Sequence, residues 1–189
     1  MSAKIFVIAG PNGAGKSTGA AAILPKRFPS TRFLNADDIA KALATDSRIE
    51  AGKVMLRRMR ELRDQRESFA FETTLAGKSH ARFLREGLEV GYRIHIAYVW
   101  LSSVDLAKER VAARVADGGH DIPRSDIERR YWRGLKNFFQ LYLPLADRWL
   151  LCDNSGNRVV TVASGIASEE PTINDQQRFD RIQHEAQRV

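Results

Sequence analysis

Residues 8–18 read IAGPNGAGKST, and this stretch predicts the fold of the chain. Residues 10–17 fit the pattern G-x-x-x-x-G-K-[ST], which is a phosphate-binding loop. The apolar run 4–9 before it predicts a buried strand. The alanine-rich segment 17–24 after it, which stops at Pro25, predicts a helix. A strand, a glycine-rich turn and a helix in this order are the setting in which such a loop binds nucleotide phosphates.

The residue types in the loop indicate how it binds phosphate. Glycines let backbone N–H groups face the phosphate oxygens, and the positive end of the following helix points at the same oxygens. Lys16 is expected to neutralise the β- and γ-phosphates, and Ser17 to offer its hydroxyl to Mg²⁺. The predicted nucleotide-binding residues here are Gly10, Pro11, Asn12, Gly13, Ala14, Gly15, Lys16, Ser17 and Thr18. The motif leaves open whether the phosphate passes to a small molecule, to water, or nowhere.

The composition is that of an ordinary globular protein. The chain has 189 residues, of which 43% are hydrophobic and 28% charged, enough for one domain with a substantial core. The longest apolar runs are too short to span a bilayer. We find no signal peptide, and the single cysteine, Cys152, excludes an internal disulfide. These features favour a cytoplasmic location.

Predicted strands alternate with predicted helices along most of the chain, which indicates an α/β domain with a mostly parallel sheet. The further strands are expected at residues 32–35, 68–71, 93–101, 149–152 and 158–162. With the phosphate loop, this order predicts a P-loop NTPase-like three-layer sandwich with a helical lid. We expect residues 1–165 to form this domain and residues 166–189 to form a polar, helical tail.

Acidic and polar residues follow the predicted strands, where the ligand crevice of a parallel sheet lies. Asp37 either accepts a proton from a substrate hydroxyl or serves the first turn of a helix, and for Asp38 we favour the helix turn. Glu72 either orders Mg²⁺ through water, binds substrate, or is a solvated turn residue. Thr74 either donates to the substrate or satisfies the turn.

The arginines of residues 106–137 suggest a lid. Arg110 and Arg114 are four residues apart and therefore share a helix face. Arg130 lies on a second predicted helix, and Arg124 lies in the glycine-hinged connection between the two. Two arginine-bearing helices around a mobile loop can close over ATP and stabilise phosphoryl charge. The alternative is a pair of solvated helix faces.

The net charge of +7 and the pI near 9.8 invite a comparison with nucleic-acid-binding proteins. The basic residues of segment 57–66 lack interleaved aromatic residues, so they support single-strand binding poorly. The arginines of the predicted lid instead suit a polyanionic small ligand such as ATP. His120, in the lid connection, is a further residue within reach of phosphate. This placement argues against nucleic acid as the partner.

Five stretches in order resemble the zeta toxin family of P-loop kinases: GPNGAGKST, NADDIA, FETTLAG, RVADGGHDIPRSDIERRYWRGLKNF and CDNSG. The resemblance covers about residues 4–157, and GGH-x-[IV]-P followed by RRY is its distinctive part. The best-known zeta toxins use ATP and Mg²⁺ to phosphorylate the 3′-hydroxyl of the sugar in UDP-N-acetylglucosamine. Members of the family are blocked by an antitoxin protein, so the resemblance also implies a separately encoded partner.

The resemblance implies roles for individual residues. Asp37 would take the hydroxyl proton, and Glu72 and Thr74 would contact the substrate. Arg114 would act on the ATP phosphates, helped by Arg110 or by the segment that holds Arg124 and Arg130. Asn154, in the run 153–156, would lie near the adenine.

These observations predict an ATP-dependent kinase of a small molecule, with Asp37, Lys16 and Arg114 as its catalytic residues. By resemblance the acceptor is UDP-N-acetylglucosamine, and another metabolite of nucleoside or sugar type is the alternative. A nucleotide-controlled binding module without transferase activity is the competing hypothesis from another class.

Overall fold

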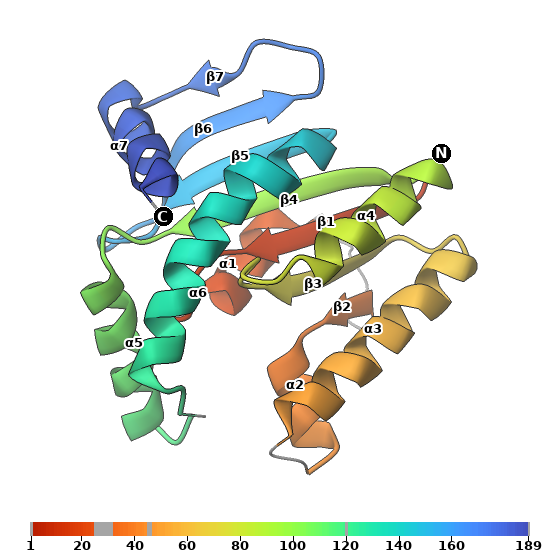
Figure 1. Ribbon diagram of the computed structural model, residues 1–189, viewed down its shortest axis with the longest axis horizontal. Helices are drawn as coiled ribbons and strands as arrows, with labels where there is room; N and C mark the ends of the chain where they lie inside the picture. Colours follow the sequence, from red (N-terminus) through yellow and green to blue (C-terminus); the bar gives the residue numbers. More distant parts are fainter. Residues whose placement is uncertain (1, 25–31, 45–46, 120, 189) are drawn as a thin grey trace.

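The computed structural model describes residues 2–24, 32–44, 47–119 and 121–188 (Figure 1). His120, predicted above to reach phosphate, lies outside the described residues. Seven strands form one sheet in the order β2-β3-β1-β4-β5-β6-β7. The strands are β1 (Lys4–Ala9), β2 (Phe33–Leu34), β3 (Phe69–Thr73), β4 (Arg93–Trp100), β5 (Arg148–Asp153), β6 (Val160–Ile166) and β7 (Thr172–Ile173). The helices are α1 (Lys16–Ile23), α2 (Ala36–Ala42), α3 (Arg48–Asp64), α4 (Ser79–Glu89), α5 (Val104–Ala116), α6 (Arg124–Asn137) and α7 (Gln176–Gln187), with a π-helical turn η2 (Phe138–Tyr142) and a 3₁₀ turn η3 (Leu143–Leu145) after α6.

Strand β1 lies in the middle of the sheet and places the phosphate loop there. It pairs in parallel with β3 on one side and with β4 on the other. Residues 5–9 are fully or almost fully buried, which is why this strand is a continuous apolar run. Strands β2 and β5 extend the parallel sheet, whereas β6 and β7 add to it in the antiparallel sense. The mostly parallel α/β fold predicted from the sequence is therefore confirmed.

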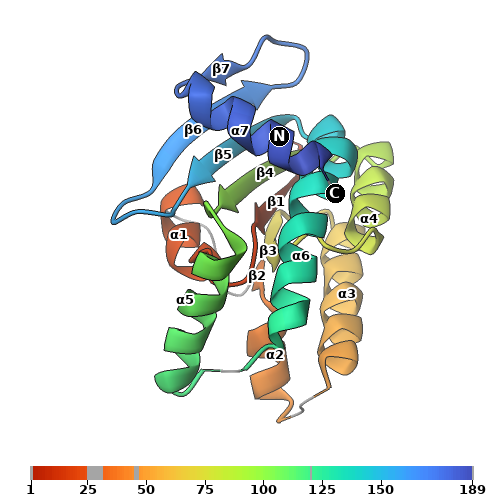
Figure 2. The same ribbon diagram turned by 60° about the vertical axis from the view of Figure 1, so that its left-hand side comes forward.

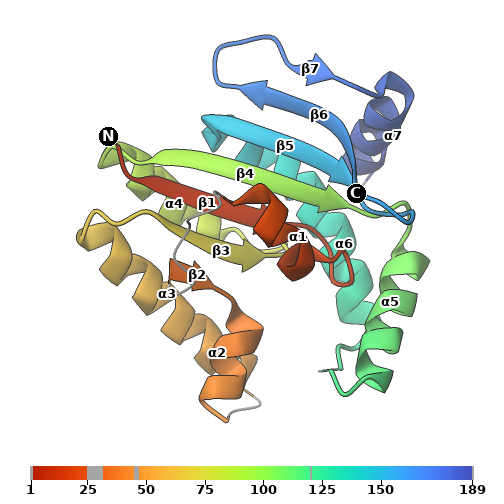
Figure 3. The ribbon, with the colours of Figure 1, turned by 180° about the vertical axis from the view of Figure 1, so that it is seen from behind.

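Helices cover both faces of the sheet, which gives three layers (Figures 1 and 3). The larger core lies under α3, α4 and α6, where Met59, Leu84 and Leu135 are completely buried. Helix α1 covers the opposite face, where Leu24 packs against Ile8. Helices α5 and α6 lie side by side and extend past the carboxyl ends of the strands (Figure 2).

The carboxyl-terminal half of α6 is fixed to the loop that follows β3. A Cβ atom at Gly134 would lie 2.2 Å from the carbonyl oxygen of Thr74, so only glycine allows this approach. The Asn137 amide donates to the carbonyl of Leu75 at 2.7 Å. The Tyr142 hydroxyl, just beyond the helix, donates to the carbonyl of Gly77 at 2.6 Å. These contacts anchor one end of the predicted lid.

At two helix starts the sequence carries a pattern that predicts a side-chain cap. The Asn35 side chain accepts from the backbone N–H of Asp37 at 2.9 Å and caps α2, as its position after a strand predicts. The spacing of Ser125 and Glu128 predicts a capping box, and this prediction is wrong. Helix α6 begins at Arg124 after Pro123, without a side-chain cap, so Ser125 already lies inside the helix.

The residues after β5 continue the same sheet and core. Strand β6 runs through residue 165, where the sequence suggested a boundary, and β7 pairs with it. Helix α7 buries Phe179, Ile182 and Ala186 in the larger core. None of the described helices is both long and apolar enough to cross a membrane.

Because His80 is partly buried, we expect the free energy of unfolding to depend on pH. Burial lowers the pKa of His80 from 6.5 to about 4. As the pH falls through this window, the unfolded chain takes up the proton before the folded chain does, so stability is lost by about 1 kcal/mol per pH unit. Urea unfolding at pH 7.5 and at pH 5.5 measures this loss. His80→Gln should reduce the pH dependence, whereas replacement of the exposed His184 should leave it unchanged, and equal slopes in all three proteins would contradict the assignment.

Candidate active site

The phosphate loop connects β1 to α1 in the middle of the carboxyl edge of the sheet. Gly10, Gly13 and Gly15 have φ angles of +144°, +80° and +71°, which side chains other than glycine rarely adopt. A Cβ atom at Gly10 would also lie 2.2 Å from the carbonyl oxygen of Val99. The glycines are therefore required by the backbone path of the loop.

Lys16 is a buried cation at the start of α1. Its residue surface is 6% exposed, and its Nζ donates to the carbonyl of Pro11 at 2.9 Å. The Glu72 Oε1 lies 3.5 Å from the same nitrogen. Burial lowers the pKa of Lys16, while the charges of Glu72 and Asp37 oppose this and the charge of Arg114 adds to it. The charges of Glu72, Asp37 and Arg114 thus all act on the ammonium group of Lys16. The structure therefore brings these predicted site residues close to one another.

Glu72, at the end of β3, joins three elements of the site. Its Oε2 accepts from the Ser17 hydroxyl at 2.6 Å and from the Asn35 amide at 3.3 Å. Its side chain is only 15% exposed, so the solvated-turn alternative for Glu72 is wrong. A hydroxyl beside a carboxylate offers the hard oxygen ligands that Mg²⁺ takes together with substrate phosphates. Within the described ranges, no cluster of three or more His, Cys, Asp or Glu side chains could hold a metal by itself.

Asp37 and Asp38 both lie in the first turn of α2, and both are exposed. Asp37 is the one of the two whose charge acts on Lys16. It is thus near the phosphate loop and open to a ligand at the same time. Thr74 is partly buried and its carbonyl faces Gly134, while the neighbouring Thr73 hydroxyl accepts from the N–H of Leu75 at 3.2 Å.

The four arginines predicted to bind ATP lie in different surroundings. Arg110 donates to the carbonyl of Asn154 at 2.7 Å and to that of Ser155 at 3.3 Å. Arg114, one helical turn further, is close enough to Lys16 to lower its pKa. Arg130 lies 3.5 Å from Asp126 in the same helix, and Arg124 is exposed at the start of α6. Arg110 also lies beside the phosphate loop, since a Cβ atom at Gly13 would be 3.1 Å from the Cβ of Arg110. Arg110 and Arg114 are therefore the two of these arginines that the structure links to the loop.

Asn154 connects the turn after β5 to the phosphate loop, a contact that the sequence did not predict. Its side-chain amide donates to the carbonyl of Ala14 at 2.9 Å. Its backbone N–H donates to the carbonyl of Trp100 at 3.0 Å, at the end of β4. The role of Asn35 as a partner of Glu72 was also missed, because the sequence identified Asn35 only as a helix cap. In both cases the signal was a polar residue directly after a strand.

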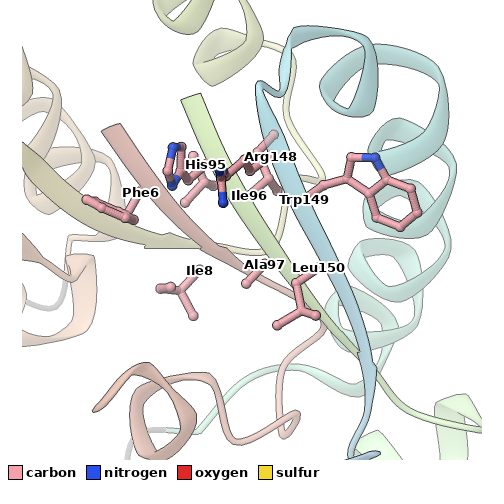
Figure 4. A pocket seen from close by; sticks show the side chains of 9 residues that line it. Phe6, Ile8, His95, Ile96, Ala97, Arg148, Trp149 and Leu150 are labelled. Carbon is pink, nitrogen blue, oxygen red and sulfur yellow. The ribbon is translucent and has the colours of Figure 1, made fainter. Parts of the chain in front are cut away.

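A separate hollow lies on the sheet face that α1 partly covers. It has a volume of about 170 Å³, and the lining residues include Phe6, Ile8, His95, Ala97 and Leu150 (Figure 4). Its lining includes none of the loop residues or carboxylates described above. The hollow is therefore distinct from the candidate active site.

The pKa of Lys16 provides a test of the Lys16–Glu72 contact. Glu72→Gln removes the charge that most strongly opposes the effect of burial, so the pKa of Lys16 should fall further. Acetylation of the neutral amine, followed by mass spectrometry across a pH series, reports this shift, with exposed Lys53 as the internal control. Lys16 should become reactive at lower pH in the variant, and an unchanged profile would show that the two groups do not interact.

Several known proteins are similar to this chain. A Haemophilus influenzae protein of uncharacterised function is 26% identical over 144 residues, 69% of this chain and 94% of that protein. One chain of the AvrRxo1-ORF1:AvrRxo1-ORF2 complex with sulphate ions is 17% identical, with a TM-score of 0.78, over 96% of this chain and 63% of that one. This chain thus spans less than two thirds of that neighbour. The structure of the PezAT toxin–antitoxin system of Streptococcus pneumoniae matches with a TM-score of 0.63 and 15% identity, over 99% of this chain and 85% of that chain.

The two solved structures share fewer than a fifth of their residues with this chain, so these likenesses concern the fold alone. The phosphate loop, the central strand before it and the lid helices after it fall within a single family match. That match is to the family described as AAA domain, and it extends over residues 5–140. The chain belongs to this AAA domain family.

Proposed function

We propose that the protein is an ATP-dependent phosphotransferase that acts on a hydroxyl group of a small molecule. The observation that carries the proposal is that Lys16 and the Ser17 hydroxyl of the phosphate loop both contact the carboxylate of Glu72, with a second carboxylate, Asp37, nearby. Glu72 contacts Lys16 and Ser17 directly, and exposed Asp37 acts on Lys16 by its charge. A loop that only binds nucleotide needs no exposed carboxylate beside it. The AvrRxo1-ORF1:-ORF2 complex with ATP, at a TM-score of 0.77, supports ATP as the donor.

The reaction requires in-line displacement at the γ-phosphorus. The acceptor oxygen forms a bond to this phosphorus, the bond from it to the β–γ bridging oxygen breaks, and ADP leaves. Asp37 takes the proton of the acceptor hydroxyl. Lys16 and Arg114 stabilise the negative charge that develops on the oxygens of the transferred phosphoryl group. Ser17 and Glu72 would hold Mg²⁺, which neutralises the β- and γ-phosphates when bound.

The proposal also extends to the identity of the molecule that accepts the phosphoryl group. The sequence resembles the zeta toxins, and the PezAT structure is among the structural neighbours, so UDP-N-acetylglucosamine is the first acceptor to test. Glu72 and Thr74 lie on the β2–β3 side of the loop and would contact it. A nucleoside or sugar acceptor would use the same residues.

A protein partner is a second part of the proposal. Two neighbours were crystallised as complexes or belong to toxin–antitoxin systems. By analogy, a separately encoded protein would bind this chain and regulate it. A cytoplasmic location is consistent with both roles.

The base is tested by a pair of adjacent substitutions. Asp37→Asn should lower the transfer rate by about 10²- to 10⁴-fold while ATP still binds, because the proton acceptor is lost. Asp38→Asn, in the same helical turn, should stay within about twofold of the wild type. The assay incubates each protein with Mg²⁺-ATP and UDP-N-acetylglucosamine, and mass spectrometry detects a product heavier by one phosphoryl group. Full activity of Asp37→Asn would rule out this mechanism.

Absence of a phosphorylated product in this assay also distinguishes between the hypotheses. If the wild type binds ATP but leaves UDP-N-acetylglucosamine unchanged, this acceptor is wrong, and a metabolite extract replaces it in the same assay. If no extract component is phosphorylated, the binding-module hypothesis is favoured over the transferase.

The lid is tested by its arginines. Arg114→Ala should lower the transfer rate by about 10²-fold or more, because a cation that stabilises the transferred group is lost. Arg133→Ala removes an exposed arginine of α6 and serves as the matched control. Equal, small effects of both substitutions would indicate that the lid arginines are merely solvated.

A further inference from the structure

Helix α7 contacts the candidate active site through Arg178. The Nε of Arg178 lies 3.3 Å from Oδ2 of Asp153, the last residue of β5. The Asp153 side chain is 10% exposed, so this carboxylate is largely removed from water and needs a partner. Helix α7 lies outside the family match, which ends at residue 140. The contact is therefore a feature that the family comparison does not cover.

Asp153 in turn fixes the conformation of the residues that follow it. Its Oδ1 accepts from the backbone N–H of Ser155 at 2.8 Å and from the Ser155 hydroxyl. The same hydroxyl oxygen accepts from the N–H of Ser102, after β4, at 2.7 Å. One carboxylate thus holds the turn 153–155 with one oxygen and Arg178 with the other.

This turn touches the phosphate loop directly. The Asn154 amide donates to the carbonyl of Ala14, and Arg110 of α5 donates to the carbonyls of Asn154 and Ser155. A Cβ atom at Gly15 would lie 2.9 Å from the Asn154 nitrogen, so the contact is tight. The turn therefore lies beside the phosphate loop, where it can contact the part of a ligand that extends beyond the phosphates.

The strand order indicates which part of the nucleotide lies at this turn. The carboxylates of the acceptor side follow β2 and β3, and the turn 153–155 follows β5, on the other side of β1. In-line transfer places the acceptor and the leaving nucleotide on opposite sides of the γ-phosphorus. The nucleoside therefore extends toward the β4–β5 side, where the turn lies; this step rests on the proposed function.

We propose that Arg178 is a positioning residue for nucleotide binding. Through Asp153, it holds the turn 153–155 in the conformation that receives the nucleoside of ATP. It does not touch the phosphates, which bind at the loop on the other side of Asn154. Loss of Arg178 therefore weakens the binding of ATP and leaves the binding of a bare polyphosphate unchanged.

The test compares two ligands by isothermal titration calorimetry on the full chain. With Arg178→Ala, the Kd for Mg²⁺-ATP should rise about three- to fivefold, the size expected for loss of one partly exposed ion pair. The Kd for Mg²⁺-tripolyphosphate should stay at the wild-type value. Arg178→Lys, which keeps the charge, should recover part of the affinity for ATP. Arg188→Ala removes an exposed arginine at the end of the same helix and should change neither value.

A double-mutant cycle tests the route through Asp153. Asp153→Asn keeps an oxygen for Ser155 and removes the charge that pairs with Arg178. The double variant should bind ATP about as well as either single variant, because the pair acts as a unit. Thermal unfolding of each variant separates loss of the turn from loss of the fold.

The outcomes are distinguishable. Equal weakening of ATP and tripolyphosphate, or no change for ATP, would overturn the role of Arg178, as would additive effects in the cycle. A wild type that binds neither ligand would overturn both this inference and the proposed function. A wild type that binds ATP, responds to Arg178→Ala as expected and transfers no phosphate would support the inference while the proposed function fails.

Discussion

The buried ammonium group of Lys16 is the charge around which the candidate site is organised. It lies between the carbonyl of Pro11 and the carboxylate of Glu72, at the junction of β1 and α1. A buried cation is tolerated only when paired and hydrogen-bonded, so its position requires Glu72 at the end of the neighbouring strand. The parallel pairing of β1 with β3, which sets Ile8 opposite Glu72, provides that carboxylate. The register of the β1–β3 pair therefore also determines whether the buried charge of Lys16 has a partner.

The sequence predicted the parts of this site that depend on local patterns. The phosphate loop, the central strand and the α/β class follow from a glycine motif between an apolar run and a helix, and these predictions are confirmed. The buried stripe of α6, which includes Ile127, Tyr131 and Leu135, also follows from helical spacing. The motif Gly10–Ser17 is informative because the positive φ angles of its three glycines are ones that other residues rarely adopt.

The features that the sequence did not reveal are those set by tertiary packing. The bond from Asn154 to Ala14 joins residues 140 positions apart, and no local pattern encodes it. The failed capping box at Ser125 shows the same limit, because α6 begins at Arg124, directly after Pro123, two residues before the start that a cap at Ser125 predicts. Arg110 was assigned to phosphate from its helix-face spacing with Arg114 and from the resemblance to the zeta toxins, and the structure shows this side chain bonded to the turn after β5.

The contacts at Gly134 and Asn137 have a mechanical consequence for the lid. They join the carboxyl-terminal half of α6 to the loop after β3, through a close backbone approach at Gly134 and a buried side-chain hydrogen bond from Asn137. If α6 moved as a lid, this end would stay in place and the helix would turn about Gly134. Arg124 lies ten residues from Gly134 and Arg130 four, so such a turn would carry Arg130 about two fifths as far as Arg124. The distance that each arginine could travel would then depend on its position along the helix.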